Sequence, residues 1–220
     1  FTGSKNHNIK LPQLAIKKGL KINEYGIFDK KNHRLASKTE EEMYRRLGLD
    51  YIEPELREDT GEIEAAGRHA LPRLLELKDI RGDFHAHTDY SDGRDSVKDM
   101  AQAAVEMGYD YICLTDHSVS LKVAHGLDPA RLKQKKREIE RINKGLKNFR
   151  ILFGSEVEID AEGEIDYKDD VLAQFDIVVA AIHSGFKQSK KQLTKRIVKA
   201  CQNKFVHIVA HPTGKLWPTR

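Results

Sequence analysis

The chain has 220 residues and a mass of 25.1 kDa, and 39% of its residues are hydrophobic, which suffices for a buried core in one or two domains. No apolar run approaches the ~18 residues of a membrane span and no signal peptide is present, so we expect a cytoplasmic protein without a membrane partner. Its formal net charge is only +4, and its two cysteines, Cys113 and Cys201, exclude a disulfide framework and a Cys-rich zinc site. Any metal ligands must therefore be His, Asp or Glu.

Residues 1–59 are predicted to form a small α+β unit. The stretch "LPQLAIKKGL" has helical character that ends at Gly19, "KINEYGIF" predicts one strand, and "RLA" predicts a return strand. Thr39 and Glu42 form a capping-box pattern that predicts a second helix over "EEEMYRRLG". Residues 60–78, rich in Gly and Pro, are expected to be a linker with one helical turn.

From residue 79 onward, strand and helix patterns alternate. Strands are predicted over "IRGDFHAH", "YDYICLTDH", "FRILFGSEVEI", "FDIVVAAIH" and "FVHIVAH", with helices over 97–107, 129–146 and "SKKQLTKRIVKACQ". The runs "YICL", "IVVAAI" and "HIVA" are almost wholly apolar, as in strands buried on both faces. This alternation predicts an α/β fold with a parallel sheet built from right-handed βαβ units.

Two stretches of this second part, residues 131–150 and 187–204, are strongly basic. Most runs of charge are solvated helix faces, and these two stretches are open to that interpretation. Together with a metal motif, the same charge also favours a polyanionic substrate.

Candidate metal ligands stand at the carboxyl end of every predicted strand. His85 and His87 are one residue apart, so a strand places both side chains on one face, and Asp92 follows in a turn closed by Gly93. The later strands end in Asp116 and His117, in Glu156, in His183 and in His211. Because the carboxyl ends of parallel strands lie on one side of a sheet, we expect these residues to meet in space. The other histidines, away from strand ends, are assigned structural roles: His7, His33, His69, His125 and His207.

This ligand set indicates a class of chemistry. Imidazole and carboxylate without thiolate suit zinc, manganese or iron, and the ligands are too numerous for a single ion. Clustered divalent ions bind a phosphate oxygen and lower the pKa of a bound water. The residues therefore predict hydrolysis of a phosphate ester.

The motifs "DFHAHTDYSDG", "LTDHS", "GSEVEID", "AIHSG" and "AHPTG" resemble, in this order and spacing, the polymerase and histidinol phosphatase (PHP) domain over residues 79–220. The resemblance implies a distorted seven-stranded β/α barrel with up to three manganese or zinc ions. One ion would be held by His85, His87 and Glu156, a second by Glu156, His183 and His211, and a third by Asp92 and His117. Glu156, His183 and His211 would be catalytic, and Asp116 would orient an imidazole.

The beginning of the chain resembles a second family. "FTGSKNHN" followed by "GLKINEYGIF" is similar to the junction of palm and thumb in family X DNA polymerases. The resemblance places Phe1 and Gly3 against the sugar of an incoming dNTP and Asn8 near the DNA minor groove. Pro12 stands where this family usually has an arginine.

Together the two resemblances imply the C-terminal part of a bacterial DNA repair polymerase, with DNA and dNTP as partners. Its PHP domain would be a metal-dependent 3′–5′ exonuclease. The palm, with the aspartates that hold magnesium, is expected before Phe1, and a final Asp-x-His motif with the last two barrel strands after Arg220, so the barrel here is expected to be incomplete. Two alternatives remain open, a phosphatase for a small phosphomonoester such as histidinol phosphate and a non-catalytic module that stabilises the polymerase or binds DNA.

Overall fold

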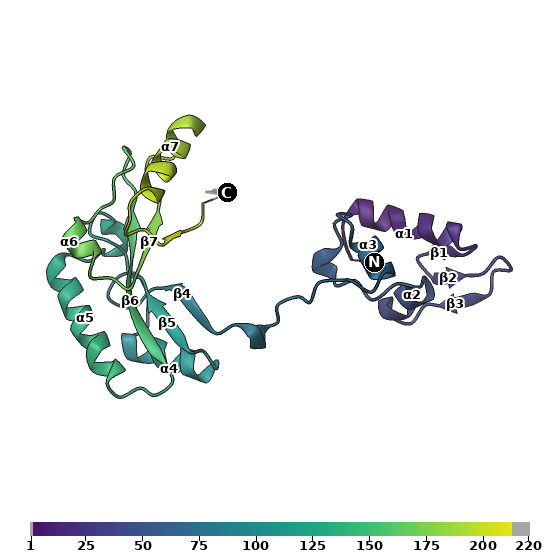
Figure 1. The fold of residues 1–220 in the computed structure, drawn as a ribbon, viewed down its shortest axis with the longest axis horizontal. Coiled ribbons are helices and arrows are strands. Elements are labelled where there is room, and N and C mark those ends of the chain that lie inside the picture. Colours follow the sequence, from purple (N-terminus) through teal and green to yellow (C-terminus); the bar gives the residue numbers. More distant parts are fainter. Residues whose placement is uncertain (1, 213–220) are drawn as a thin grey trace. The chain divides into compact units, whose positions relative to one another are not determined.

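A computed structural model describes residues 2–212 of the chain, which divides into two compact units, residues 1–75 and 76–220 (Figure 1). Within the described residues, no helix has the length and apolar character needed to cross a lipid bilayer. Each unit has a hydrophobic core of its own.

The first unit contains a small antiparallel sheet and short helices. Its elements are α1 (Lys5–Lys17), β1 (Lys21–Asn23), β2 (Gly26–Phe28), β3 (Arg34–Ala36), α2 (Glu40–Arg46), the 3₁₀ turn η1 (Pro54–Leu56) and α3 (Glu62–Gly67). The strands lie in the order β1-β2-β3. Helix α1 begins earlier than predicted, because the side chain of Ser4 accepts a hydrogen bond from the backbone N–H of His7 and so caps it.

The prediction of one strand over "KINEYGIF" was wrong. The segment is a hairpin, in which Asn23 pairs with Gly26 and the side chain of Asn23 accepts a hydrogen bond from the N–H of Tyr25. Gly26 has a φ of 133°, and a Cβ atom there would lie 2.2 Å from the carbonyl oxygen of Ala36. Only glycine fits this turn, and the sheet therefore has three strands instead of two.

Helix α3 falls within the segment that we expected to be a linker, yet it belongs to the first unit. Ile63 and Ala66 of this helix are buried in the first core. The other buried apolar residues of this core are Leu11, Ala15, Ile27, Ala36, Tyr44, Leu47, Leu49 and Ile52. The segment is therefore packed at least as far as α3.

A buried polar network fixes α3 to α1 and α2. Nδ1 of His7 lies 2.6 Å from Oε1 of Glu62, and Nε2 of His7 lies 2.8 Å from the hydroxyl of Tyr44. Glu62 also accepts hydrogen bonds from the backbone N–H groups of Asp59 and Thr60. Burial alone would raise the pKa of Glu62, but the bonds from His7 and the backbone outweigh it and lower this pKa to about 2.

We expect Glu62→Gln to destabilise the first unit in a pH-dependent way. The folded pKa of Glu62, about 2, lies below its ordinary value of 4.5. The charged carboxylate therefore stabilises the fold, by of order 3 kcal/mol, above pH 4.5, and loses this contribution as the pH falls from 4.5 toward 2. Exchange of the α1 amide protons measures the free energy of unfolding of this unit, and Glu64→Gln, on the exposed side of α3, is the control. The expectation would be contradicted if Glu62→Gln and the unaltered protein differed in free energy of unfolding by the same amount over this whole pH range.

The second unit is an α/β structure with one parallel sheet. Its elements are the 3₁₀ turn η2 (Leu77–Asp79), β4 (Gly82–Ala86), α4 (Val97–Glu106), β5 (Tyr111–Leu114), the 3₁₀ turn η3 (Lys122–Ala124), α5 (Pro129–Asn143), β6 (Arg150–Glu158), α6 (Asp169–Leu172), β7 (Ile177–Ala181), α7 (Lys190–Cys201) and β8 (Ile208–Val209). The strands lie in sequence order, β4-β5-β6-β7-β8, and each neighbouring pair is parallel. The predicted parallel α/β fold is confirmed.

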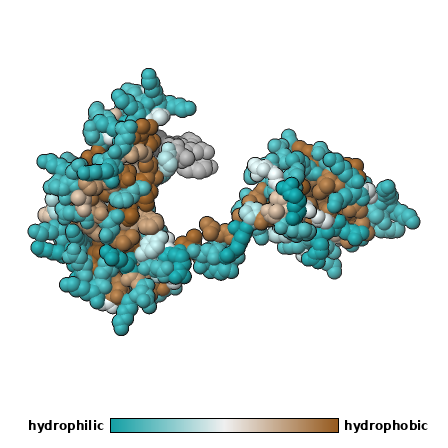
Figure 2. Space-filling view, viewed as in Figure 1, coloured by the Kyte–Doolittle hydropathy of each residue, from teal (hydrophilic) through white to brown (hydrophobic). Residues whose placement is uncertain are grey.

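The sheet curls into a half-barrel, with α5 and α6 along its outer side (Figure 1). Ile112, Leu114, Ile151 and Val178 of the strands are buried in the second core, together with apolar side chains of the helices. Figure 2 shows hydrophobic side chains on the side of this unit opposite α5. The described residues form five parallel strands, as in part of a PHP barrel, and the count of seven stays a prediction.

Candidate metal centre

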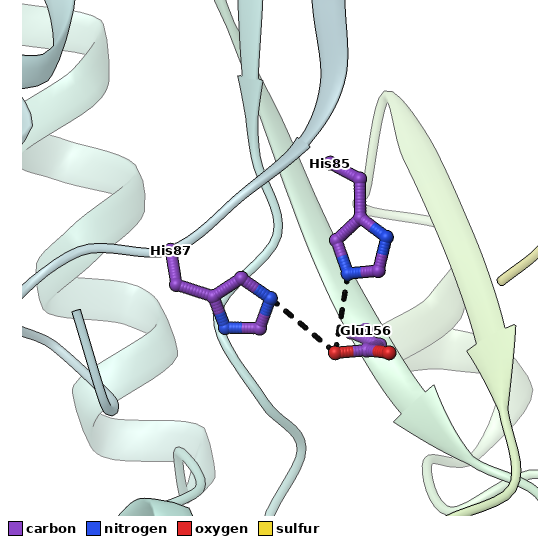
Figure 3. A group of neighbouring side chains, drawn as sticks. All are labelled: His85, His87 and Glu156. Carbon is purple, nitrogen blue, oxygen red and sulfur yellow. Dashed lines mark ion pairs between the residues drawn. The ribbon is translucent and has the colours of Figure 1, made fainter. Parts of the chain in front are cut away.

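The centre of the site is Glu156, which points from β6 and is only 2% exposed. Its Oε2 atom is surrounded by imidazole nitrogens from two neighbouring strand ends. Nε2 of His85 lies 3.2 Å from Oε2, Nε2 of His87 lies 3.3 Å away, and Nδ1 of His117 lies 3.1 Å away. Figure 3 shows His85 and His87 converging on Glu156. The alternation of side chains along a strand brings these two histidines to one face, as predicted.

The second oxygen of Glu156 faces two further imidazoles, from the ends of the last two strands. Nε2 of His183 lies 3.2 Å from Oε1, and Nε2 of His211 lies 2.9 Å from it. The side chain of His211 is 53% exposed, so this residue forms the open side of the cluster. One carboxylate thus contacts five imidazoles, which come from the carboxyl ends of four different strands or from the residues that follow them.

Asp92 extends the cluster away from Glu156. Its Oδ1 atom lies 3.0 Å from Nδ1 of His87, and its Oδ2 atom lies 3.4 Å from Nε2 of His117. His87, Asp92 and His117 therefore form one potential metal-binding group. Two other potential groups share Glu156: one contains His85 and His87, and the other contains His117 and His183.

These groups overlap with the ligand sets that the PHP resemblance implied, but differ in detail. The first expected set, His85, His87 and Glu156, forms one group as it stands. Asp92 and His117 lie together, with His87 as an additional neighbour. His183 is grouped with His117 instead of His211, although both His183 and His211 contact the same oxygen of Glu156. The assignment of each ligand to an ion stays a prediction.

The donor set fits divalent metal ions. The described cluster offers imidazole nitrogen and carboxylate oxygen without sulfur, as zinc and manganese sites do. Nδ1 of His117 is buried and makes no hydrogen bond within residues 2–212, although it lies 3.1 Å from Oε2 of Glu156. A single carboxylate has too few lone pairs to satisfy five imidazoles, whereas cations between them would use the nitrogen lone pairs.

The charges of the cluster are strongly coupled. Burial acts to raise the pKa of Glu156, but hydrogen bonds from His183, His85 and His87 dominate and hold this pKa far below its ordinary value. The bonds of His183 to Glu156 and Glu158 raise the pKa of this histidine to about 9. A metal ion that binds Nε2 of His183 must therefore displace a proton, and metal affinity rises with pH.

Glu158 is a member of the site that the sequence analysis missed. Its Oε2 atom lies 2.8 Å from Nδ1 of His183, and its carboxylate also accepts bonds from the backbone N–H of His183 and the hydroxyl of Ser184. It thereby orients the ring so that Nε2 faces Glu156. The spacing of two residues from Glu156 along β6 was the available signal, because it puts both carboxylates on the same face.

Asp116 does not have the role that we expected. It is fully buried, and within the described chain it bonds no imidazole. Its carboxylate accepts hydrogen bonds from the N–H and hydroxyl of Thr88 and from the hydroxyl of Ser91, and forms an ion pair with Lys135. Asp116 therefore holds the loop between His87 and Asp92, and so positions these residues through the backbone.

The two basic stretches form α5 and α7, and each of these helices places one buried cationic side chain against the residues that hold the site. Nζ of Lys135, on α5, lies 2.7 Å from Oδ2 of Asp116 and also donates to the carbonyls of Leu114 and Gly154. On α7, Arg196 donates to the carbonyl of Ser184, directly after His183. The interpretation of these stretches as solvated or DNA-facing surfaces is therefore wrong for these two residues. Both precede a buried apolar residue by one helical turn, which was the signal that could have identified them.

The predicted nucleotide-binding residues lie in the first unit. Phe1 falls outside the described residues. Gly3 has a φ of 141°, and a Cβ atom there would lie 2.8 Å from Cβ of Arg57. Nδ2 of Asn8 lies 3.5 Å from the carbonyl oxygen of Gly3. The turn before α1 is thus held against Arg57, and the nucleotide and DNA contacts of Gly3 and Asn8 stay predictions.

The fold and the site together define a class: a parallel α/β protein with a cluster of histidines and carboxylates, suited to metal ions, at the carboxyl ends of its strands. Residues 83–216 match the model of the PHP domain, and residues 1–58 match the model of the DNA polymerase beta thumb. The chain belongs to the PHP domain family, and its PHP domain follows a segment that matches a polymerase thumb.

Individual relatives support the same assignment. The chain is 46% identical to the DNA polymerase/3′-5′ exonuclease PolX of Bacillus subtilis over 217 residues, which are 98% of this chain and 38% of that protein. It is 32% identical to a probable phosphatase of Thermoanaerobacter sp. (strain X514) over 143 residues, 62% of this chain and 55% of the relative. The chain spans less than two thirds of both proteins. The predicted resemblance to a bacterial family X polymerase with a PHP domain is confirmed.

Proposed function

We propose that the PHP unit of this chain hydrolyses DNA phosphodiesters as a 3′–5′ exonuclease, with two or three manganese or zinc ions. The observation that carries hydrolysis of a phosphate ester is the position of Glu156, whose two oxygens face separate groups of imidazoles. A carboxylate in this position is suited to bridge two cations. Three overlapping donor groups support more than one ion.

In this proposal the ions would be held by His85, His87, Asp92, His117, Glu156, His183 and His211. When bound, they would polarise a phosphate oxygen and lower the pKa of a water molecule. The protein contributes the fixed donor geometry, because Glu158 orients His183 and Asp116 holds the loop of Asp92. Hydrolysis joins a water oxygen to phosphorus and breaks the bond from phosphorus to the 3′ oxygen of the preceding nucleotide. A 5′-mononucleotide is released, and the new 3′ oxygen takes up a proton.

DNA as the substrate is supported by the first unit and by the name of a relative. A thumb of the DNA polymerase beta type precedes the PHP domain, and the match to an exonuclease of Bacillus subtilis covers 98% of the chain. We further propose that the native protein is a repair polymerase that binds DNA and dNTP, with Gly3 and Asn8 close to the nucleotide and the minor groove. Polymerisation would require a palm with magnesium-binding aspartates.

A phosphatase for small phosphomonoesters is the second candidate, because several relatives at about 32% identity over the PHP region are named probable phosphatases. Those matches cover only 62% of this chain, whereas the match to the polymerase/exonuclease includes the thumb. The thumb therefore favours the nuclease.

The two functions are separated by comparing substrates at equal concentration in manganese. We expect the native protein to release mononucleotides from the 3′ end of labelled DNA with a higher kcat/KM than it shows for histidinol phosphate or p-nitrophenyl phosphate. Label released first from the 5′ end would contradict the polarity. A preference for the monoesters would favour the phosphatase, and failure to cleave any of them in any metal would favour a non-catalytic module.

A further inference from the structure

The pocket of the metal centre has one wall that the metal ligands do not explain. Its open volume is about 660 Å³, and it is lined by the ligand cluster together with Leu121, Val123 and Ala124. These three residues lie in and next to η3, in the loop that follows His117. Val123 is 86% exposed and is apolar, so it presents an aliphatic side chain to solvent beside a polar site.

The backbone of this loop is tied at its base to the metal ligands. The N–H of Leu127 donates to the carbonyl of His117 at 2.8 Å, and the N–H of Ser118 donates to the carbonyl of Glu156 at 3.0 Å. The N–H of Gly126 closes the turn on the carbonyl of Leu121 at 3.1 Å. The position of η3 is therefore fixed by the same residues that form the centre.

Side chains outside the loop fix it further. The carboxylate of Asp166 accepts a hydrogen bond from the N–H of Ser120 at 2.9 Å, and the guanidinium of Arg131 donates to the carbonyl of His125 at 2.8 Å. At Gly126, a Cβ atom would lie 1.8 Å from the carbonyl oxygen of Ser118, so the chain passes itself closely here. A loop with this many anchors holds its tip in place and keeps Val123 from folding back onto the core.

A single exposed aliphatic residue is common on protein surfaces and needs no function. Val123 differs because a fixed turn presents it in the same pocket as the metal ligands. A substrate that places a phosphate at the ligands and an apolar surface on Val123 must carry both groups within the span of this pocket. A nucleotide meets this requirement, because its sugar joins the phosphate to a base with a broad apolar face.

We propose that the turn Leu121–Ala124 is the contact surface for the 3′-terminal nucleobase of a DNA strand bound at the metal centre, with Val123 as the principal contact. This inference rests on the proposed nuclease function and deepens it. Burial of an aliphatic surface under the face of a base requires no hydrogen bond, so the contact is independent of base identity. The enzyme then removes a terminal nucleotide with any of the four bases, and it prefers a nucleotide that carries a base to an abasic one.

The test combines Val123→Ser with removal of the base. Oligonucleotides that end in a normal nucleotide or in a tetrahydrofuran abasic nucleotide are hydrolysed by the native protein, by Val123→Ser and by Val198→Ser, a control at a 52% exposed position on α7. We expect Val123→Ser to raise KM for the normal strand by about 3–10-fold, below the factor that a closed apolar pocket provides. With the abasic strand the variant and the native protein should be equal, because the contact is already absent. Fluorescence anisotropy of the same strands should show the same difference in Kd.

If Val123→Ser raised KM equally for both strands, or did not raise KM for the normal strand, the assignment of Val123 would be overturned while the nuclease function stayed intact. A loss of the same size in Val198→Ser would do the same. If the native protein hydrolysed neither strand, the proposed function itself would fail, and this inference with it.

Discussion

Replacing Glu156 with glutamine is expected to lower phosphodiester hydrolysis by at least about 10²–10³-fold. Glutamine keeps the size of the side chain but removes the negative charge that five imidazole rings face. An amide also has one oxygen instead of two, so it cannot bridge the two sides of the cluster. The loss should appear in both kcat and KM, because the ions that would bind the phosphate and lower the pKa of the water depend on this carboxylate.

The same variant should also lose metal, which activity measurements alone do not establish. Titration with manganese or zinc, read by competition with a chelator, should show fewer ions bound by Glu156→Gln than by the native protein. Glu106→Gln is the matched control, since Glu106 is an exposed residue on α4 whose carboxylate bonds only Gln102 among the described residues. Native activity and native metal content in Glu156→Gln would show that the site lies elsewhere.

The second large effect is expected on stability, from Lys135→Met. Lys135 is completely buried, and its Nζ lies 2.7 Å from the equally buried Asp116. Methionine fills a similar volume but leaves a buried carboxylate without a counter-charge, which typically costs about 3–5 kcal/mol. Because Asp116 also holds Thr88 and Ser91, the loop that carries Asp92 should loosen as well. Urea unfolding of the native protein and the variant measures the loss.

Two further variants isolate the ion pair from the packing. Lys133→Met changes an exposed lysine of the same helix and should alter the free energy of unfolding by less than about 0.5 kcal/mol. The double variant Lys135→Met with Asp116→Asn removes both charges and should be more stable than Lys135→Met alone. If Lys135→Met unfolds at the same urea concentration as Lys133→Met, the buried pair does not stabilise this protein.

The sequence predicted well which side chains meet in space, because their positions depend on simple geometry. His85 and His87 share a face through the period of two along a strand, and the remaining candidates follow from the parallel order of the strands. Each lies at the expected edge of the sheet, within a few ångströms of Glu156. The strands themselves were predictable because both faces are buried, which leaves long apolar runs in the sequence.

The residues that support the site were harder to predict from the sequence, for physical reasons. Lys135 stands among Lys133, Lys136 and Arg137, and charge alone does not show which of these cations faces inward. Its partner Asp116 lies on a different element, so the pair exists only once the helix has packed on the sheet. Asp116 itself was assigned to an imidazole because of its neighbour His117, whereas adjacent residues on an extended chain point to opposite sides.

The spread of the ligands along the chain has a consequence for synthesis. His85 and His87 leave the ribosome about 120 residues before His211. At about 5–20 residues per second, that separation corresponds to roughly 6–25 s in which nascent imidazoles exist without their full set of partners. If the centre binds metal as proposed, an ion that reached the chain during this interval would meet only part of the donor set. Its identity would then depend on local supply as well as on the preference of the finished centre.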